Sequence, residues 1–373
     1  MSHDETKKPA RLLSLDALRG FDMFWIMGGE NIIHALGQLT NWAIFVWLGT
    51  QMEHVTWNGF RFYDNIFPLF LFIAGITMPY SLTRRIEKGD PKSKIYRHIV
   101  FRGILLVILG FVYNGLFRLD FEHQRYASVL GRIGLAWMFA AIIFMNTKTR
   151  GQIVWFVALL LGYWAVMTLV PVPGYGAGVL TKEGSLAAYL DRMLLPGRLH
   201  LGIHDPEGIL STIPAIATAL MGVLTGKFLQ LSKQGLEPFR KGLYILGAGI
   251  VSIALGWLWN LAFPVNKNLW TSSFVLVAGG WSLVYLSIFY IIIDVWNFRK
   301  WAFFFVVIGL NPITIYLCQA GMINFEGTVK FFFGGALSMM PELWQNFMGA
   351  VLYVGVSWLF LYFLYKKKIF LKV

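Results

Sequence analysis

The sequence predicts an all-α integral membrane protein with about ten transmembrane helices. Apolar residues make up 57% of the 373 residues and charged residues only 14%, whereas an ordinary soluble domain carries about 25% charge. The apolar residues gather in stretches of about 20, which is the length needed to cross a hydrocarbon core of about 30 Å. The stretches are uniformly apolar rather than alternating, which excludes the strands of a membrane β-barrel. In chain order they are 21–37, 65–83, 99–117, 128–146, 152–172, 209–229, 242–263, 270–294, 301–320 and 343–365.

The loop charges predict the orientation of these helices. An even number of spans places both termini on one side, and that side then carries 23 of the 32 Lys and Arg residues. An excess of Lys and Arg marks the cytoplasmic side. We therefore expect both termini in the cytoplasm, with 1–20 as an N-terminal flank and 171–208 as a long outer loop. The basic residues are scattered over helix ends, so the high pI does not require a nucleic acid partner.

The chain is expected to form a single domain over 1–373, because no low-complexity linker interrupts it. Its one cysteine, Cys318, lies in an apolar stretch and excludes a disulfide framework or a thiolate metal cluster. His200 and His204 have the spacing of a helical metal pair, but no third ligand is fixed nearby, so we predict no metal site.

The strongest candidate for chemistry lies just before the second apolar stretch, where His54 follows Glu53 and precedes Asp64. A histidine with a carboxylate neighbour can take up a proton near neutral pH. The alternative is an interfacial histidine in a loop anchored to the membrane surface by Trp57, which Asn58 follows.

Polar residues also interrupt the first apolar stretch, where Glu30 and Asn31 follow two glycines. A carboxylate at membrane depth is costly unless it is paired, hydrated or protonated. The residues predict either a polar pocket wall or a buried pair between Glu30 and His34, which lies one helical turn further on.

Three further segments carry polar groups that could bind a ligand. Asp205 and Glu207 end the long outer loop near the start of a helix, where they either cap that helix or bind a ligand. The amides and ammonium of 266–268 suit hydroxyl or carbonyl groups, although the same pattern fits a capping turn. Asn311 precedes a proline that frees backbone groups within the ninth stretch, and 366–368 is a lysine run typical of a headgroup-binding flank.

Taken together, these segments resemble the heparan-α-glucosaminide N-acetyltransferase family and its bacterial members over nearly the whole chain. The resemblance rests on the order and spacing of short motifs. These are Ser14-Leu15-Asp16 with Arg19-Gly20, His54 with Trp57-Asn58-Gly59, Asp64 with Phe67-Pro68, Val129-Leu130 with Arg132, Pro171-Val172-Pro173-Gly174, Asp191-Arg192, Asp205 to Leu210, Pro264 to Trp270, Gly309 with Asn311, and Lys367-Lys368-Ile369-Phe370.

The resemblance implies transfer of acetyl from cytoplasmic acetyl-CoA to the amine of a glucosamine-type sugar on the far side of the membrane. The family's active-site histidine falls on His54, and Glu30 stands where the family carries an active-site asparagine. His54 would act as general base or as nucleophile, with Glu53 or Asp64 orienting it. Predicted acceptor-binding residues are Glu53, Asn31, Trp57, Asn58, Asp205, Glu207, Asn266, Lys267 and Asn268, and predicted coenzyme-binding residues are Arg19, Arg102, Arg132 and Asn311.

Two other functions fit the same residues. An amino-sugar or peptidoglycan-fragment permease would use the outer acids without a coenzyme, and a cell-envelope glycan O-acyltransferase would acylate a hydroxyl. The chain holds no N-glycosylation sequon, which favours a bacterial inner-membrane protein. The family resemblance also suggests a homodimer.

Overall fold

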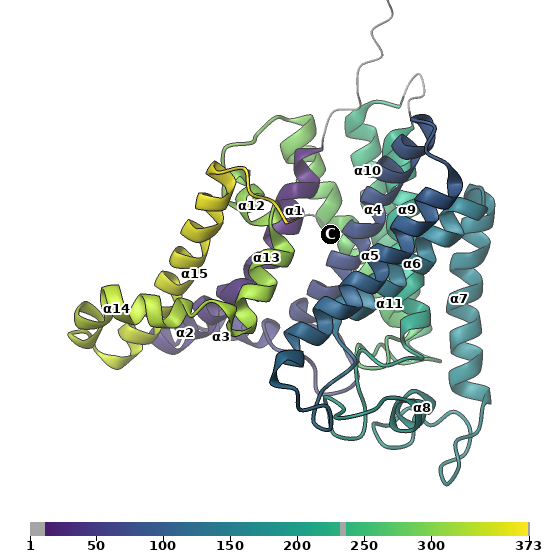
Figure 1. Cartoon of the computed structure of the whole chain (residues 1–373), viewed down its shortest axis with the longest axis horizontal. Coiled ribbons are helices and arrows are strands. Elements are labelled where there is room, and N and C mark those ends of the chain that lie inside the picture. Colours follow the sequence, from purple (N-terminus) through teal and green to yellow (C-terminus); the bar gives the residue numbers. More distant parts are fainter. Residues whose placement is uncertain (1–11, 232–235, 372–373) are drawn as a thin grey trace, which may run out of the picture.

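The computed structural model describes residues 12–231 and 236–371, and their regular elements are all helices (Figure 1). The predicted all-α class is therefore confirmed. Residues 1–11 of the predicted N-terminal flank lie outside the described part of the chain.

Eight helices among the described residues are long and apolar enough to cross a membrane. They are η2 (Phe62–Asn65) continued by α4 (Ile66–Glu87), α5 (Lys92–Tyr113), α6 (Val129–Asn146), α7 (Thr149–Leu169), α9 (Thr212–Gln230), α10 (Pro238–Trp259), α11 (Ser272–Phe289) continued by η4 (Tyr290–Val295), and α15 (Glu342–Lys366). A ninth span is formed if α12 (Ala302–Gly309) is counted with α13 (Pro312–Leu317) and η5 (Cys318–Met322), although a bend of 72° separates them. The described helices therefore support eight or nine spans, where the sequence predicted about ten.

The first predicted stretch accounts for part of this difference, because it is not one straight helix. It divides into α1 (Leu13–Phe24), a π-helical turn η1 (Trp25–Gly29) and α2 (Glu30–Thr40). Gly28 within the turn has a φ of 112°, which residues with a side chain rarely adopt. The chain bends here, and α2 lies beside α3 (Ala43–Gln51) at the end of the molecule away from the start of α1 (Figure 1).

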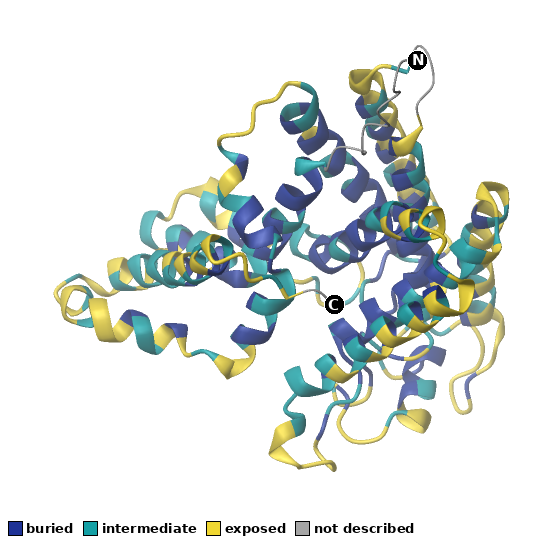
Figure 2. Cartoon of the chain, turned by 45° about the horizontal axis from the view of Figure 1, so that its top comes forward, coloured by how far each residue is buried: buried dark blue, intermediate teal, exposed yellow. Residues whose placement is uncertain are grey.

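Glycines bring the central helices into backbone contact. A Cβ at Gly20 of α1 would lie 1.7 Å from the Phe305 carbonyl oxygen, and one at Gly309 of α12 would lie 1.9 Å from the Asp16 carbonyl oxygen. In the same way, a Cβ at Gly75 of α4 would lie 2.2 Å from the Ala219 carbonyl oxygen, and one at Gly222 of α9 would lie 2.1 Å from the Phe72 carbonyl oxygen. Small residues allow this close packing where lipid offers no hydrophobic drive between helices. Buried residues concentrate where the central helices meet (Figure 2).

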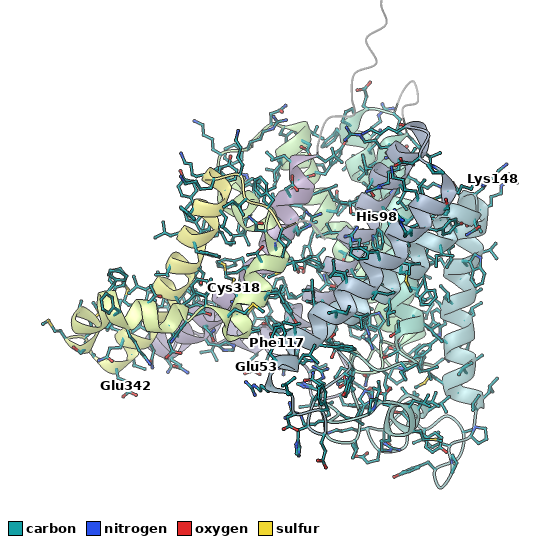
Figure 3. The ribbon with its side chains drawn as sticks, viewed as in Figure 1. Glu53, His98, Phe117, Lys148, Cys318 and Glu342 are labelled. Atoms are coloured by element: carbon teal, nitrogen blue, oxygen red, sulfur yellow. The ribbon has the colours of Figure 1, made fainter. Side chains whose placement is uncertain are left out.

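The connections between helices separate into two groups. The α4–α5, α6–α7 and α11–α12 connections gather at one end, the upper end in Figure 1, and include the exposed Lys148 labelled in Figure 3. The opposite end carries the long loops, α8 (Leu186–Leu194), the short turn η3 (Leu116–Arg118), α14 (Phe325–Ser338) and Glu53. We call the first the basic end and the second the loop end. The location of both termini in the cytoplasm remains a prediction.

Candidate active site

His54 and Asp64 form a direct contact at the loop end. His54 lies in the loop after α3, and Asp64 lies in η2 at the start of the next span. The His54 Nδ1 atom lies 2.8 Å from Asp64 Oδ1, and the other carboxylate oxygen accepts the Arg61 backbone N–H at 2.9 Å. The Asp64 side chain is fully buried, while the imidazole is 49% exposed. This pairing assigns the hydrogen to Nδ1 and leaves a lone pair on Nε2.

Lys267 completes this cluster from the loop between α10 and α11. Its Nζ atom lies 2.9 Å from His54 Nε2 and 3.9 Å from Asp64 Oδ1. Nζ is also 3.0 Å from His54 Nδ1, but that nitrogen donates to Asp64, so only Nε2 can accept from the ammonium. Burial lowers the pKa of Lys267, while the negative charges of Asp64 and Glu207 raise it.

Glu30 joins the cluster through a tyrosine that sequence reasoning missed. Tyr63 donates its hydroxyl hydrogen to Glu30 at 2.7 Å, and its ring centroid lies 4.9 Å from that of His54. Glu30 is therefore one side chain removed from the imidazole. Asn31 is exposed beside it on α2.

A second polar cluster faces the same region from the loop before α6. Arg125 donates to Asp205 through Nε at 2.8 Å and Nη2 at 2.6 Å, and also contacts Glu207. Asp205 accepts the His200 backbone N–H at 3.0 Å as well. Burial works against charge on Arg125, but its hydrogen bonds to the two acids raise its pKa. Sequence reasoning missed Arg125, because only the fold brings it to Asp205.

Several predicted acceptor-binding residues hold the loops together instead of facing the cavity described next. Asn266 donates to Asn58 at 3.0 Å and accepts the Leu269 backbone N–H at 2.8 Å. Trp57 donates to the Leu180 carbonyl at 2.9 Å, which joins the His54 loop to the long loop. Glu53 pairs with Arg61 at 3.1 Å on the surface.

An outer cavity of about 500 Å³ brings the main groups together. Its lining includes His54, Tyr63, Arg125, Glu207, Lys267 and Asn268. An inner cavity of about 960 Å³ lies toward the basic end and is lined by Arg19, Arg102, Lys366 and Lys368 among others. Five side chains line both cavities, so the two adjoin within the helix bundle: Phe70, Leu130, Ile133, Pro312 and Ile313.

The inner cavity contains two of the four predicted coenzyme-binding residues. Arg19 pairs with Asp16 at 3.6 Å, and the Arg102 guanidinium lies 4.1 Å from the centre of the Trp137 ring. Lys366 and Lys368 were assigned to a membrane flank by sequence, whereas the fold turns both into the cavity wall.

The other two predicted coenzyme-binding residues do not line this cavity. Arg132 is buried and donates to the Gly208 carbonyl at 3.2 Å and to Ser211. Asn311 binds the C-terminal segment, donating to the Ile369 carbonyl at 3.0 Å and accepting the Leu371 N–H at 3.1 Å. Asn311 thereby fixes the segment that carries Lys368.

The chain is similar in sequence to two curated proteins. It is 30% identical over 424 aligned positions to the Homo sapiens heparan-α-glucosaminide N-acetyltransferase, in a match covering 98% of this chain and 60% of that protein. The Mus musculus protein of the same name is also 30% identical, over 375 positions that cover 86% of this chain and 56% of that protein. The chain therefore spans less than two thirds of the length of these relatives. No family model matches the chain.

Fold and site together define a multi-spanning helical membrane protein in which a carboxylate–histidine–lysine cluster faces one of two adjoining cavities. Over most of its length the chain is similar in sequence to heparan-α-glucosaminide N-acetyltransferases.

Proposed function

We propose that this protein transfers acetyl from cytoplasmic acetyl-CoA to the amine of a glucosamine-type sugar on the far side of the membrane. The observation that carries the proposal is the pair of adjoining cavities, one with His54 and the other with four basic side chains. The names of the two relatives supply the reaction class. We place the protein in a bacterial inner membrane with both termini in the cytoplasm.

Acetyl-CoA fits the inner cavity by charge and by polarity. Its phosphates need cations, and Arg19, Arg102, Lys366 and Lys368 supply them at the basic end. The pantetheine arm is less polar than the nucleotide and suits the apolar boundary between the two cavities, which includes Phe70. The thioester would then reach the outer cavity, where His54 lies.

The His54 cluster provides the groups that amide formation requires. A thioester is attacked by a neutral amine, and His54 Nε2 can remove the proton that the amine carries. The new C–N bond forms as the C–S bond breaks, the sulfur leaves as coenzyme A thiolate, and the thiolate takes up the second proton that the nitrogen loses as the amide forms. Asp64 holds the imidazole in the tautomer that accepts at Nε2. Alternatively Nε2 attacks the thioester itself, and the amine then attacks acetyl-histidine.

Lys267 occupies the position from which a cation can stabilise the developing negative charge on the acetyl oxygen. Its Nζ atom lies 2.9 Å from Nε2 and 3.0 Å from Nδ1 of the imidazole, and its side chain is only 14% exposed. A charge so poorly hydrated stabilises an oxyanion more strongly than one in water. Substrate entry would move the ammonium from Nε2 to the acyl oxygen and free the lone pair for the amine.

Release of coenzyme A thiol by the purified protein, given acetyl-CoA and glucosamine, tests this function. We expect thiol release and N-acetylglucosamine with the wild type and neither with His54→Ala. His123→Ala is the matched control, because His123 also pairs with an aspartate but is 72% exposed. A permease would release no thiol and would carry labelled sugar into liposomes. An O-acyltransferase would acetylate a hydroxyl instead of the amine, and mass spectrometry of the product would locate the acetyl group.

A further inference from the structure

A second histidine–aspartate pair lies at the loop end and has no part in the proposed acetyl transfer. His204 belongs to the long loop, its side chain is fully buried, and its Nδ1 atom lies 3.4 Å from Asp191 Oδ2 of α8. Its Nε2 atom lies 3.0 Å from the Asn268 backbone carbonyl oxygen, which can only accept, so Nε2 carries the hydrogen. Neither member of the pair lines the outer cavity. The buried imidazole therefore acts on the site only through the backbone that it holds.

Asp191 is fixed by the backbone around it. One carboxylate oxygen accepts the Ile209 backbone N–H at 3.0 Å, and the other accepts the Asp205 backbone N–H at 3.4 Å. A Cβ at Gly208 would lie 2.1 Å from Asp191 Oδ2, so the carboxylate fills space that only a glycine leaves open. Asp191 thus ties α8 to the end of the long loop and gives His204 a fixed neighbour.

The carbonyl that the buried imidazole holds belongs to the turn that brings Lys267 into the site. Both Lys267 and Asn268 line the outer cavity. Trp270 in this turn has a φ of 52°, a left-handed value that residues with a side chain seldom adopt. A backbone in such a conformation persists only where its surroundings hold it. Tyr163 of α7 donates to the Leu269 carbonyl at 2.5 Å, and the buried imidazole donates to the carbonyl before it.

His204 also contacts the loop that carries His54. The centroid of its ring lies 5.9 Å from that of Trp57, with the two rings nearly perpendicular at 74°. The His54 loop and the turn are joined directly as well, because the Gly59 backbone N–H donates to the Val265 carbonyl at 2.8 Å. His204 therefore lies where the long loop, the His54 loop and the turn meet.

We propose that His204 is a positioning residue that sets the place of the Lys267 ammonium beside His54. This inference rests on the proposed function, because it takes Lys267 as the group that stabilises the oxyanion. Without the Nε2 hydrogen the Asn268 carbonyl would lose its partner, and the strained turn would relax. The ammonium would then leave its place 2.9 Å from His54 Nε2. Because such stabilisation depends on preorganised geometry, the rate would fall although both substrates still bind.

Two amide substitutions at position 204 test the proposal. A glutamine amide nitrogen reaches the place of the imidazole Nε2, whereas the shorter asparagine reaches only that of Nδ1. We expect His204→Gln to keep kcat near the wild-type value and His204→Asn to lower it by about 10- to 100-fold, since a misplacement of about 1 Å can cost that much. The KM for acetyl-CoA should not change, because His204 does not line the inner cavity. In the Lys267→Met background, His204→Asn should lower kcat no further, because the two changes act through one group.

A chemical readout separates this proposal from the proposed function. Diethyl pyrocarbonate acylates a free imidazole lone pair, and the Lys267 ammonium covers the lone pair of His54 Nε2. We expect mass spectrometry of the His54 peptide to show slow modification in the wild type and in His204→Gln, and several-fold faster modification in His204→Asn and Lys267→Met. The exposed His123 is the internal reference. This pattern needs no acetyl-CoA, so it holds even if no variant transfers acetyl.

Gln152→Met is the matched control. Gln152 is a buried side chain at the basic end that donates to the Thr147 carbonyl at 2.9 Å, so the variant loses the same kind of bond away from the site. It should lower the melting temperature and leave kcat and the modification of His54 unchanged. If His204→Asn does not fold, His204→Phe takes its place, because it keeps a buried ring and loses the donor.

Three results would overturn the proposal. A donor-free variant of His204 that behaves like the Gln152 control would show that the imidazole only supports the fold. Equal losses in His204→Gln and His204→Asn would show that the bond to the Asn268 carbonyl is not the cause. A full further loss of kcat in the Lys267→Met background would show that His204 acts through another group.

Discussion

Replacement of Asp64 by asparagine should stop catalysis while leaving the site assembled. One oxygen of Asp64 accepts the Arg61 backbone N–H at 2.9 Å, and an asparagine carbonyl can keep that bond. The amide NH₂ group then faces His54 Nδ1, 2.8 Å from the replaced oxygen. Because an NH₂ group only donates, Nδ1 must accept and the ring hydrogen moves to Nε2. His54 would then present a hydrogen where the amine needs a base.

The size of the effect follows from what the variant removes. General base catalysis by a positioned side chain contributes about 10²–10⁴-fold, so kcat should fall by that factor. KM for both substrates should stay near the wild-type value, since Asp64 is fully buried and lines neither the outer nor the inner cavity. Steady-state rates of thiol release, with a thermal melt of each variant, measure both quantities.

Asp120→Asn is the matched control for this prediction. Asp120 contacts His123 Nδ1 at 3.0 Å, but both side chains are more than half exposed and neither lines the outer cavity. This variant should retain full activity. If Asp64→Asn also turned over at the wild-type rate in folded protein, the assignment of His54 as a base oriented by Asp64 would be wrong.

Three further predictions follow from the same contacts. Lys267→Met removes the ammonium 2.9 Å from His54 Nε2 and should lower kcat by about 10²–10³-fold; a change in acceptor KM alone would make Lys267 a binding group. Lys366→Gln combined with Lys368→Gln should raise the KM for acetyl-CoA several-fold and leave the KM for glucosamine unchanged. Lys148→Gln, at an exposed position of the basic end, should change neither KM. Burial alone would raise the pKa of Asp205, but Arg125 holds that pKa below its ordinary value. The ionised carboxylate therefore stabilises the folded protein fully above about pH 4, and this contribution is lost as the pH falls further. Melting temperatures from pH 7 to pH 3 should therefore fall less steeply for Asp205→Asn than for the wild type, and parallel curves would refute the coupling.

The fold class followed from hydropathy, whereas two breaks in the helices did not. Ten apolar stretches predicted spans because length and composition alone decide whether a helix can cross a bilayer. Hydropathy carries no information on backbone direction, so it could not predict the turn at Gly28 or the 72° bend between α12 and α13. The two glycines beside Glu30 and the proline after Asn311 were the local signals for these breaks.

The site was predictable where its residues are unusual for their surroundings. His54, Asp64 and Lys267 stood out as polar groups in segments predicted to lie on the outer side, and the fold brings Lys267 to an imidazole 213 residues away. Arg125, Tyr63 and Lys368 were missed because an arginine in a loop, a tyrosine at a helix start and a lysine in a terminal run are common everywhere. Their relevance depends on which distant segment they meet. Asn266 and Asn58 were both predicted to bind the acceptor, and the structure shows them hydrogen-bonded to each other and outside the lining of the outer cavity.

Transfer across a sealed membrane tests the central claim most directly. The protein is reconstituted in vesicles with labelled glucosamine inside and acetyl-CoA, which cannot cross the bilayer, outside. We predict labelled N-acetylglucosamine inside the wild-type vesicles and none inside vesicles carrying His54→Ala. Product that forms only when both substrates share one compartment, or that forms equally without the imidazole, would contradict the account.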